Sequence, residues 1–212
     1  MVSVALLVGA LFFSGLGEAA AKVEEAHPLS AADRKDLSRI QDYMNRITTL
    51  QSTFLQASSN GGYAEGTLYL SRPGKMRIEY DPPAQFLIVA DGTWLIYHDK
   101  ELEQITHIPL GTTPADILVQ ENLSLLAGEL IVTKIERGPG IIGVTLVREE
   151  DDGGQLTLIF SDKPLQLKKW IVLDPQGIKT SVSLLSTQRD VSFDPKLFNV
   201  KLKHGTWTPG DK

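Results

Sequence analysis

The side chains that most often perform catalysis or bind metals are few in this sequence, and they stand apart from one another. The four histidines (His27, His98, His107 and His204) occur in no H-x-H or H-E-x-x-H spacing, and the chain contains no cysteine. A zinc site needs three or four such ligands at suitable spacing, so the sequence favours no metal site. His98 and His107 could meet across a hairpin, but such a pair is more typical of a protein surface.

The local patterns of common enzyme sites are also missing. The sequence has neither a G-x-S-x-G nucleophile elbow nor a Walker A loop that would hold phosphates. Four consecutive acids at 149–152 precede two glycines, where a solvated hairpin turn is expected rather than a pair of catalytic carboxylates. We therefore expect no catalytic residue, no metal and no cofactor, and a protein that is not an enzyme.

One arginine stands where another kind of function can be built. Arg72 lies in an Arg-Pro-Gly corner between two strand-like runs, 68–71 and 75–80. In the second run polar residues alternate with Met76, Ile78 and Tyr80, which gives that strand one apolar face. An arginine at such a corner is either solvated or uses its five N–H donors to hold backbone carbonyls.

The elements that must position these residues are mostly β-strands. Alternation with a period of two, interrupted by turns rich in Gly, Pro and Asp, indicates eleven strands. They lie near 52–58, 63–70, 75–80, 85–90, 93–98, 102–108, 130–136, 141–148, 155–161, 165–173 and 178–188. Short strands joined by tight turns predict one antiparallel meander, which must close as a barrel or curl under a cover.

Two helices accompany the strands. Apolar residues at helical spacing between 37 and 50 predict an amphipathic helix of about 16 residues, capped at Ser30 or Asp33. Residues 111–130 predict a helical insertion in which Thr113 is the N-cap and proline follows at the first helical position. A shorter helical turn is expected from Asp194 to Phe198.

Composition indicates one globular domain in a secreted protein. The chain has 212 residues, of which 42% are hydrophobic, and its net charge of −5 argues against a nucleic-acid partner. We expect a signal peptide at 1–21, a linker at 22–32, a folded domain at 33–200 and a polar tail at 201–212. The absence of cysteine favours the bacterial periplasm over a eukaryotic secretory route.

The order of several segments resembles the LolA family of periplasmic outer-membrane lipoprotein carrier proteins. The similarity runs from about residue 36 to residue 200. It rests on "LQSTFLQ" (50–56), "GTLYLSRPGKMRIEY" (66–80), "VADGTWLIYHD" (89–99), "TPADIL" (113–118) and "FDPKLFNV" (193–200). Each motif alone is weak, but their order and spacing together are specific.

The resemblance implies a mainly β fold of the α+β class. It is an incompletely closed antiparallel half-barrel of about eleven strands, covered by an N-terminal helix and a mid-chain helical lid. The family binds lipoprotein acyl chains in the apolar space between sheet and lid. It receives its cargo from an inner-membrane ABC lipoprotein-releasing transporter and passes it to an outer-membrane lipoprotein acceptor. A monomer that binds no nucleotide and no nucleic acid is expected.

Site residues follow from the placement of the motifs. The apolar residues expected to line the acyl cavity are Met76, Ile78, Tyr80, Trp94, Ile96 and Leu118. Arg72, directly before Pro73, matches the family's arginine and is expected to latch the lid. Two alternatives share these features, namely a sensor domain of similar fold that reads lipoproteins and a carrier of another lipid.

Overall fold

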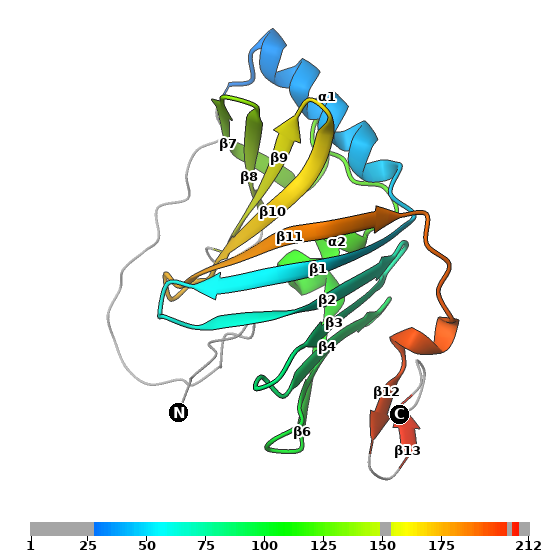
Figure 1. The fold of residues 1–212 in the computed structure, drawn as a ribbon. Coiled ribbons are helices and arrows are strands. Elements are labelled where there is room, and N and C mark those ends of the chain that lie inside the picture. The colour runs from blue at the N-terminus through cyan, green and yellow to red at the C-terminus, as the bar shows by residue number, and fades with distance from the viewer. Residues whose placement is uncertain (1–27, 149–153, 203–204, 208–212) are drawn as a thin grey trace. The chain divides into compact units, whose positions relative to one another are not determined.

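The computed structural model describes residues 28–148, 154–202 and 205–207 (Figure 1). The expected signal peptide and the acidic turn at 149–152 lie outside these residues. Along the first half of the sheet the strands are β1 (Thr49–Ser58), β2 (Tyr63–Ser71), β3 (Lys75–Tyr80), β4 (Phe86–Asp91), β5 (Trp94–Asp99) and β6 (Gln104–Pro109). The second half adds β7 (Leu130–Gly138), β8 (Ile141–Arg148), β9 (Gln155–Asp162), β10 (Leu165–Leu173) and β11 (Lys179–Arg189).

These eleven strands confirm the predicted meander. Their hydrogen-bonded order is β6-β5-β4-β3-β2-β1-β11-β10-β9-β8-β7, so the described sheet is open, with β6 and β7 as its edges. Neighbouring strands from β2 through β6 and from β7 through β11 all pair antiparallel. No helix in the described ranges is long and apolar enough to cross a membrane.

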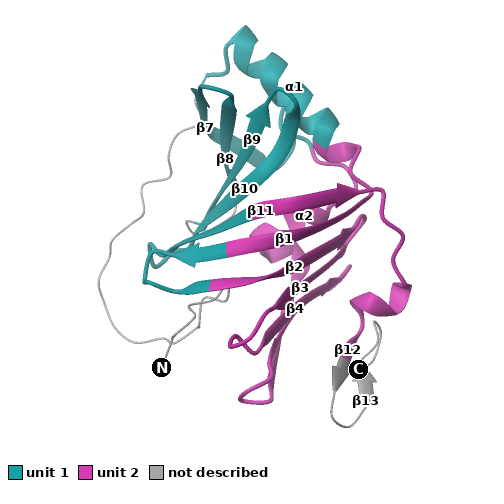
Figure 2. Ribbon diagram, viewed as in Figure 1, with its two compact units in different colours: residues 1–43, 56–63, 124–183 teal, residues 44–55, 64–123, 184–212 magenta. Residues whose placement is uncertain are grey.

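The chain divides into two compact units (Figure 2). Unit 1 comprises residues 1–43, 56–63 and 124–183, and unit 2 comprises residues 44–55, 64–123 and 184–212. Unit 1 therefore holds β7 to β10 and most of helix α1 (Ala31–Asn45), whereas unit 2 holds β3 to β6 and helix α2 (Pro114–Val119).

In unit 1, α1 begins with a reciprocal cap and packs on the strands through its apolar side. The Asp33 N–H donates to Ser30 Oγ (3.1 Å) and the Ser30 N–H donates to Asp33 Oδ2 (2.9 Å), so both predicted capping residues take part. The Tyr43 ring meets the Phe160 ring edge-on at 5.9 Å, and its hydroxyl accepts from the Leu167 N–H. The buried Tyr43 thus joins α1 to β9 and β10.

In unit 2, β3 separates two side-chain faces. The register pairs Leu68 with Ile78 and Ile78 with Ile88, so these residues lie on one side, which we call the Met76 face. Its apolar members on β2 to β5 include Leu68, Leu70, Met76, Ile78, Tyr80, Phe86, Ile88, Ala90, Leu95 and Tyr97. The opposite side, the Arg77 face, comprises Tyr69, Arg77, Glu79, Leu87, Val89, Ile96 and His98.

The insertion at 111–130 is much less helical than predicted. Only a 3-10 turn at Leu110–Thr112 and the six residues of α2 are helical, with Thr113 as N-cap and proline at the first position as expected. After α2 the backbone N–H of Leu123 donates to Asn45 Oδ1 (2.8 Å), and that of Leu125 donates to Gln41 Oε1 (2.9 Å). Because side chains of α1 bind these N–H groups, the segment is held in a bent, non-helical path.

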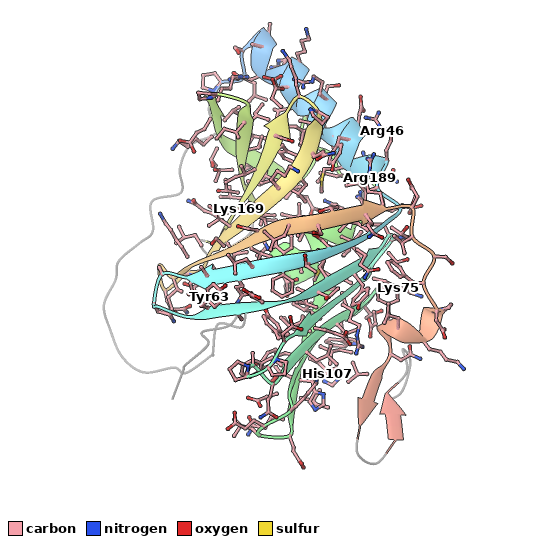
Figure 3. The ribbon with its side chains drawn as sticks, in the orientation of Figure 1. Arg46, Tyr63, Lys75, His107, Lys169 and Arg189 are labelled. Carbon is pink, nitrogen blue, oxygen red and sulfur yellow. The ribbon has the colours of Figure 1, made fainter. Side chains whose placement is uncertain are left out.

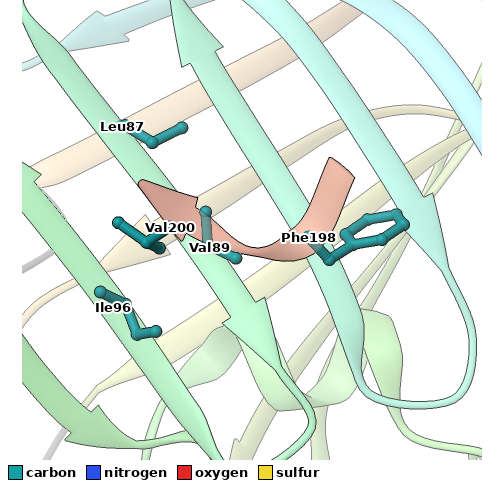
Figure 4. Close-up of a cluster of buried hydrophobic side chains, with 5 residues drawn as sticks. All are labelled: Leu87, Val89, Ile96, Phe198 and Val200. Carbon is teal, nitrogen blue, oxygen red and sulfur yellow. The ribbon is translucent and has the colours of Figure 1, made fainter. Parts of the chain in front are cut away.

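The C-terminal segment covers the Arg77 face. A 3-10 helix, η2 (Pro195–Phe198), begins where predicted, and Asp194 caps it by accepting from the Lys196 N–H (2.9 Å). The segment then forms β12 (Val200–Leu202), which pairs with β13 (Gly205–Trp207). Figure 4 shows the buried cluster that results, which consists of Leu87, Val89, Ile96, Phe198 and Val200.

Candidate functional site

The guanidinium of Arg72 joins the end of α1 to the residue that follows α2. Its Nε donates to the Gln120 carbonyl at 2.9 Å, and its two terminal nitrogens donate to the carbonyls of Met44 and Gln120. The backbone N–H of Arg72 donates to the Thr48 carbonyl (2.8 Å). One side chain at the β2–β3 corner therefore bridges two helix ends, and it does so through backbone acceptors that any residue could supply.

The charge of Arg72 is half-buried and is balanced by dipoles rather than by an anion. Burial lowers the pKa of this arginine, because desolvation penalises the charged form. None of the ion pairs between described residues includes it. An arginine stays protonated under ordinary conditions, so the carbonyls must compensate the partial loss of hydration.

The turn that carries Arg72 is docked on both sides. The Gly74 N–H donates to the Val119 carbonyl at 2.8 Å, which adds a second link to the end of α2. Gly74 has φ +77°, and a Cβ atom there would lie 2.8 Å from the Cα of Gly92 in the β4–β5 turn. Only glycine fits this position, because both the backbone angle and the close approach exclude a side chain.

The Met76 face presents a continuous apolar surface. Met76, Ile78 and Tyr80 are exposed by only 2%, 4% and 7%, and Leu118 of α2 is buried to a similar extent. The Tyr80 ring meets the Phe54 ring edge-on at 5.4 Å. The structure thus brings three of the predicted cavity residues together on one face, with the end of α2 fixed to the β2–β3 corner of the same strands.

Trp94 and Ile96 do not belong to that face, contrary to the sequence-based expectation. Ile96 pairs with Val89 in the register, and it lies in the cluster under the C-terminal segment. Trp94 stands two residues earlier on the same side of β5, with its ring 6.3 Å from that of His107 (labelled in Figure 3). Because β5 is apolar on both sides, alternation alone could not assign its faces.

The residues of β4 and β5 that do share the Met76 face were missed. They are Phe86, Ile88, Ala90, Leu95 and Tyr97. The tight turn between Asp91 and Trp94 fixes the register of β4 and β5 and pairs Ala90 with Leu95. Counting outward from this turn in the sequence would have placed these residues on the same face. No group of three or more His, Asp or Glu residues in the described ranges could hold a metal ion.

Residues 45–201 match the family model for the outer membrane lipoprotein carrier protein LolA. An outer-membrane lipoprotein carrier protein of Azotobacter vinelandii is 28% identical over 189 residues, which cover 82% of this chain and 88% of that protein. The corresponding protein of Methylococcus capsulatus is 29% identical over 180 residues, covering 80% and 85%. A solved LolA superfamily protein from Nitrosomonas europaea aligns at a TM-score of 0.41 and 11% identity, over 76% of this chain and 96% of that one, a likeness too partial to support a conclusion.

Proposed function

Because this chain belongs to the LolA family of outer membrane lipoprotein carrier proteins, we propose that it binds the acyl chains of lipoproteins and carries them to the outer membrane. Each exposed CH₂ group costs about 0.8 kcal/mol, so hiding one sixteen-carbon chain from water is worth about 12 kcal/mol. A carrier must therefore offer a large apolar surface and must still release its cargo.

The Met76 face is the surface that we assign to the acyl chains. Met76, Ile78 and Tyr80 would contact them, with Leu118 on the side of α2. Support comes from the near-complete burial of these side chains and from their shared position on unit 2. Since these side chains are buried, the proposal requires α2 to move before a chain can enter, which makes α2 its lid. Trp94 and Ile96 are not included, because they lie on the Arg77 face.

Arg72 is the latch of this lid, and its bridge between the Met44 and Gln120 carbonyls is the observation that carries the proposal. A hydrogen bond to a charged group contributes about 1.5–3 kcal/mol, so a few of them favour closure without making it irreversible. Cargo opens the lid by occupying the apolar face, and the energy regained on closing favours release.

The remaining parts of the proposal follow from the family. The carrier would work in the periplasm as a monomer that is not an enzyme. It would load from an inner-membrane ABC transporter and unload to an acceptor in the outer membrane. Mass spectrometry of the protein purified from periplasm tests the ligand class. Bound lipoprotein supports the carrier, whereas a bound isoprenoid or glycolipid would redirect the proposal to another lipid.

The latch is tested by replacing Arg72 with leucine and following lipoprotein from loaded carrier to acceptor. We expect loading to persist and onward transfer to slow, because closing no longer opposes the loaded state. Arg46→Leu is the matched control, since Arg46 is exposed, lies two residues from Met44 and is labelled in Figure 3. Unchanged transfer by a folded Arg72→Leu variant would show that Arg72 is not the latch.

A further inference from the structure

A pocket of about 510 Å³ opens on the Arg77 face, on the opposite side of β3 from the proposed acyl surface. It lies between strands β3, β4 and β5 and the C-terminal segment that carries η2. Its charged lining residues are Arg77, Lys100, Asp194 and Lys196. Nothing in the proposed handling of acyl chains uses this pocket.

Arg77 builds the wall of the pocket rather than supplying a free charge. Its Nε donates to Glu79 Oε1 at 2.7 Å, which neutralises the guanidinium. One terminal nitrogen donates to the Leu197 carbonyl (2.9 Å) and to the Asn199 carbonyl (3.4 Å). These bonds fix the C-terminal segment to β3, so the pocket has a defined shape.

Two lysines leave the pocket with an excess of positive charge. Within the described part of the chain, neither the Lys100 nor the Lys196 ammonium has a hydrogen-bond or ion-pair partner. The single carboxylate of Asp194 already accepts from the Lys196 backbone N–H. With Arg77 neutralised by Glu79, two cations face one anion, on a chain whose net charge is −5.

His98 also lines the pocket, and its ring holds a nitrogen that is unsatisfied within the described ranges. Its Nδ1 is buried and, among the residues described, has no hydrogen-bond partner, although buried polar atoms are normally satisfied by protein, water or ligand. Desolvation and the nearby Lys100 lower the pKa of His98, and the charges of Asp99 and Glu103 oppose this shift only in part. The imidazole is therefore neutral near pH 7 and can give or accept one hydrogen bond.

We propose that this pocket binds a phosphate ester with a short carbon skeleton, the chemistry of a phosphoglycerol headgroup. Two lysine ammonium groups act as point charges, a form of recognition that suits phosphate, whereas the planar fork that suits carboxylate is already occupied on Arg77. Leu87 and Leu197 line the pocket beside these charges and provide apolar contact for the carbons of the ligand. The source is either a membrane phospholipid or a free phosphate ester.

The first experiment titrates sn-glycerol 3-phosphate into the full chain at low salt. Binding is measured by calorimetry and by the NMR signals of the His98 ring, which are assigned with a His98→Gln variant. Saturable binding that perturbs the His98 signals is expected. The double variant Lys100→Gln/Lys196→Gln should weaken it at least tenfold. The control variant Lys75→Gln/Lys169→Gln removes two lysines, both labelled in Figure 3, that are not among the lining residues of the pocket. It should leave binding within about twofold.

The second experiment separates the two sources. The chain is sedimented with vesicles of phosphatidylcholine alone or with added phosphatidylglycerol. Retention by phosphatidylglycerol that is lost in the Lys100/Lys196 variant assigns the pocket to a lipid headgroup. Binding of glycerol phosphate without vesicle retention assigns it to free phosphate esters. No saturable binding in either experiment, or equal weakening by the control pair, overturns the proposal.

Discussion

Arginines hold α1 in unit 1 and the end of α2 in unit 2, but the two regions use different acceptors. In unit 1, Arg39 pairs with Asp36 (2.9 Å) and Asp162 (2.8 Å), and Arg137 bonds Asp33 and Asp36 at 2.8 Å each. In unit 2, Arg72 bonds only carbonyls in the contacts that the structure describes. One region is an exposed network of opposite charges, and the other is a half-buried cation among dipoles.

The difference fits the proposed role of Arg72 as a reversible latch. The unit 1 network spreads over three carboxylates, so losing one contact leaves others in place, but every contact is open to screening by salt. The Arg72 contact depends on one side chain that has no ionic partner to hold it back. Water can replace a carbonyl at modest cost, which suits a bond that must break and reform. Redundant pairing fastens α1, whereas a single dipole-bound cation permits exchange.

The largest expected effect comes from replacing the planar guanidinium of Arg72 while its positive charge is kept. Arg72→Lys has one ammonium in place of a planar guanidinium and cannot span the Met44 and Gln120 carbonyls together. We expect transfer of lipoprotein to fall about tenfold or more, as losing one charged hydrogen bond implies. Transfer kinetics from loaded carrier to acceptor membranes measure this. A lysine variant as fast as the wild type would mean that charge alone is sufficient.

Gly74→Ala should weaken the same corner through backbone geometry. A Cβ atom would stand 2.8 Å from Gly92 Cα at φ +77°, so we expect a loss of about 2–4 kcal/mol in the free energy of unfolding. Gly61→Ala is the control, because Gly61 has φ +92° but nothing within 4 Å of its Cβ position. It should lose only about 1 kcal/mol. Urea unfolding compares the two, and equal losses would exclude the close approach as the cause.

Arg137→Ala tests the redundancy of the unit 1 network. Since Asp33 keeps its bonds to Ser30 and Asp36 keeps its bond to Arg39, we expect only a slight fall in the urea midpoint. That fall should vanish in 1 M NaCl, where exposed ion pairs are screened. Arg34→Ala, at an exposed position on the same helix, is the control. A large, salt-independent loss would contradict the comparison, because it would make the network as critical as a buried contact.

The smallest effect is a pH dependence confined to unit 1. Hydrogen bonds from Ser30, followed by one from Arg137, lower the pKa of Asp33 from its ordinary value to about 2. Because the folded pKa lies below the unfolded one, the stabilisation is complete above pH 4 and is lost as the pH falls from 4 towards 2. Asp33→Asn should flatten this part of the stability profile, as urea unfolding at pH 2–5 would show. An unchanged slope would mean that other carboxylates dominate.

The strands and α1 could be predicted from the sequence because their patterns are local. Period-two alternation and turn residues place β1 to β11, and Ser30 with Asp33 marks the start of α1. The bent, non-helical path at 120–129 could not be predicted, because it depends on distant side chains of α1 that bind its N–H groups. The local sequence, with its leucines and its proline at the first helical position, favours a helix. It contains no sign of the α1 side chains that bind these N–H groups.

Part of the candidate site was predictable because a local alternation of polar and apolar residues reveals the face of a strand. Met76, Ile78 and Tyr80 alternate against polar residues, so their common face is visible in the sequence. Ile96 has apolar neighbours on both sides of its strand, and the C-terminal segment that covers it lies a hundred residues away in sequence. The acceptors of Arg72 are carbonyls, which every residue has, so no sequence pattern could have indicated Met44 or Gln120.

The open order of the described strands leaves two rows of backbone groups that could pair with another chain. A free strand edge is a template for aggregation, and proteins usually protect it with charges, proline or a bulge. Here β6 is largely exposed and ends at Pro109, which has no N–H to offer. The other edge, β7, has a register shift between Val132 and Lys134 and an ion pair between Lys134 and Glu136. Each edge thus discourages strand pairing between two molecules. A variant in which these edge residues are replaced would be expected to form fibrils or to precipitate at high concentration.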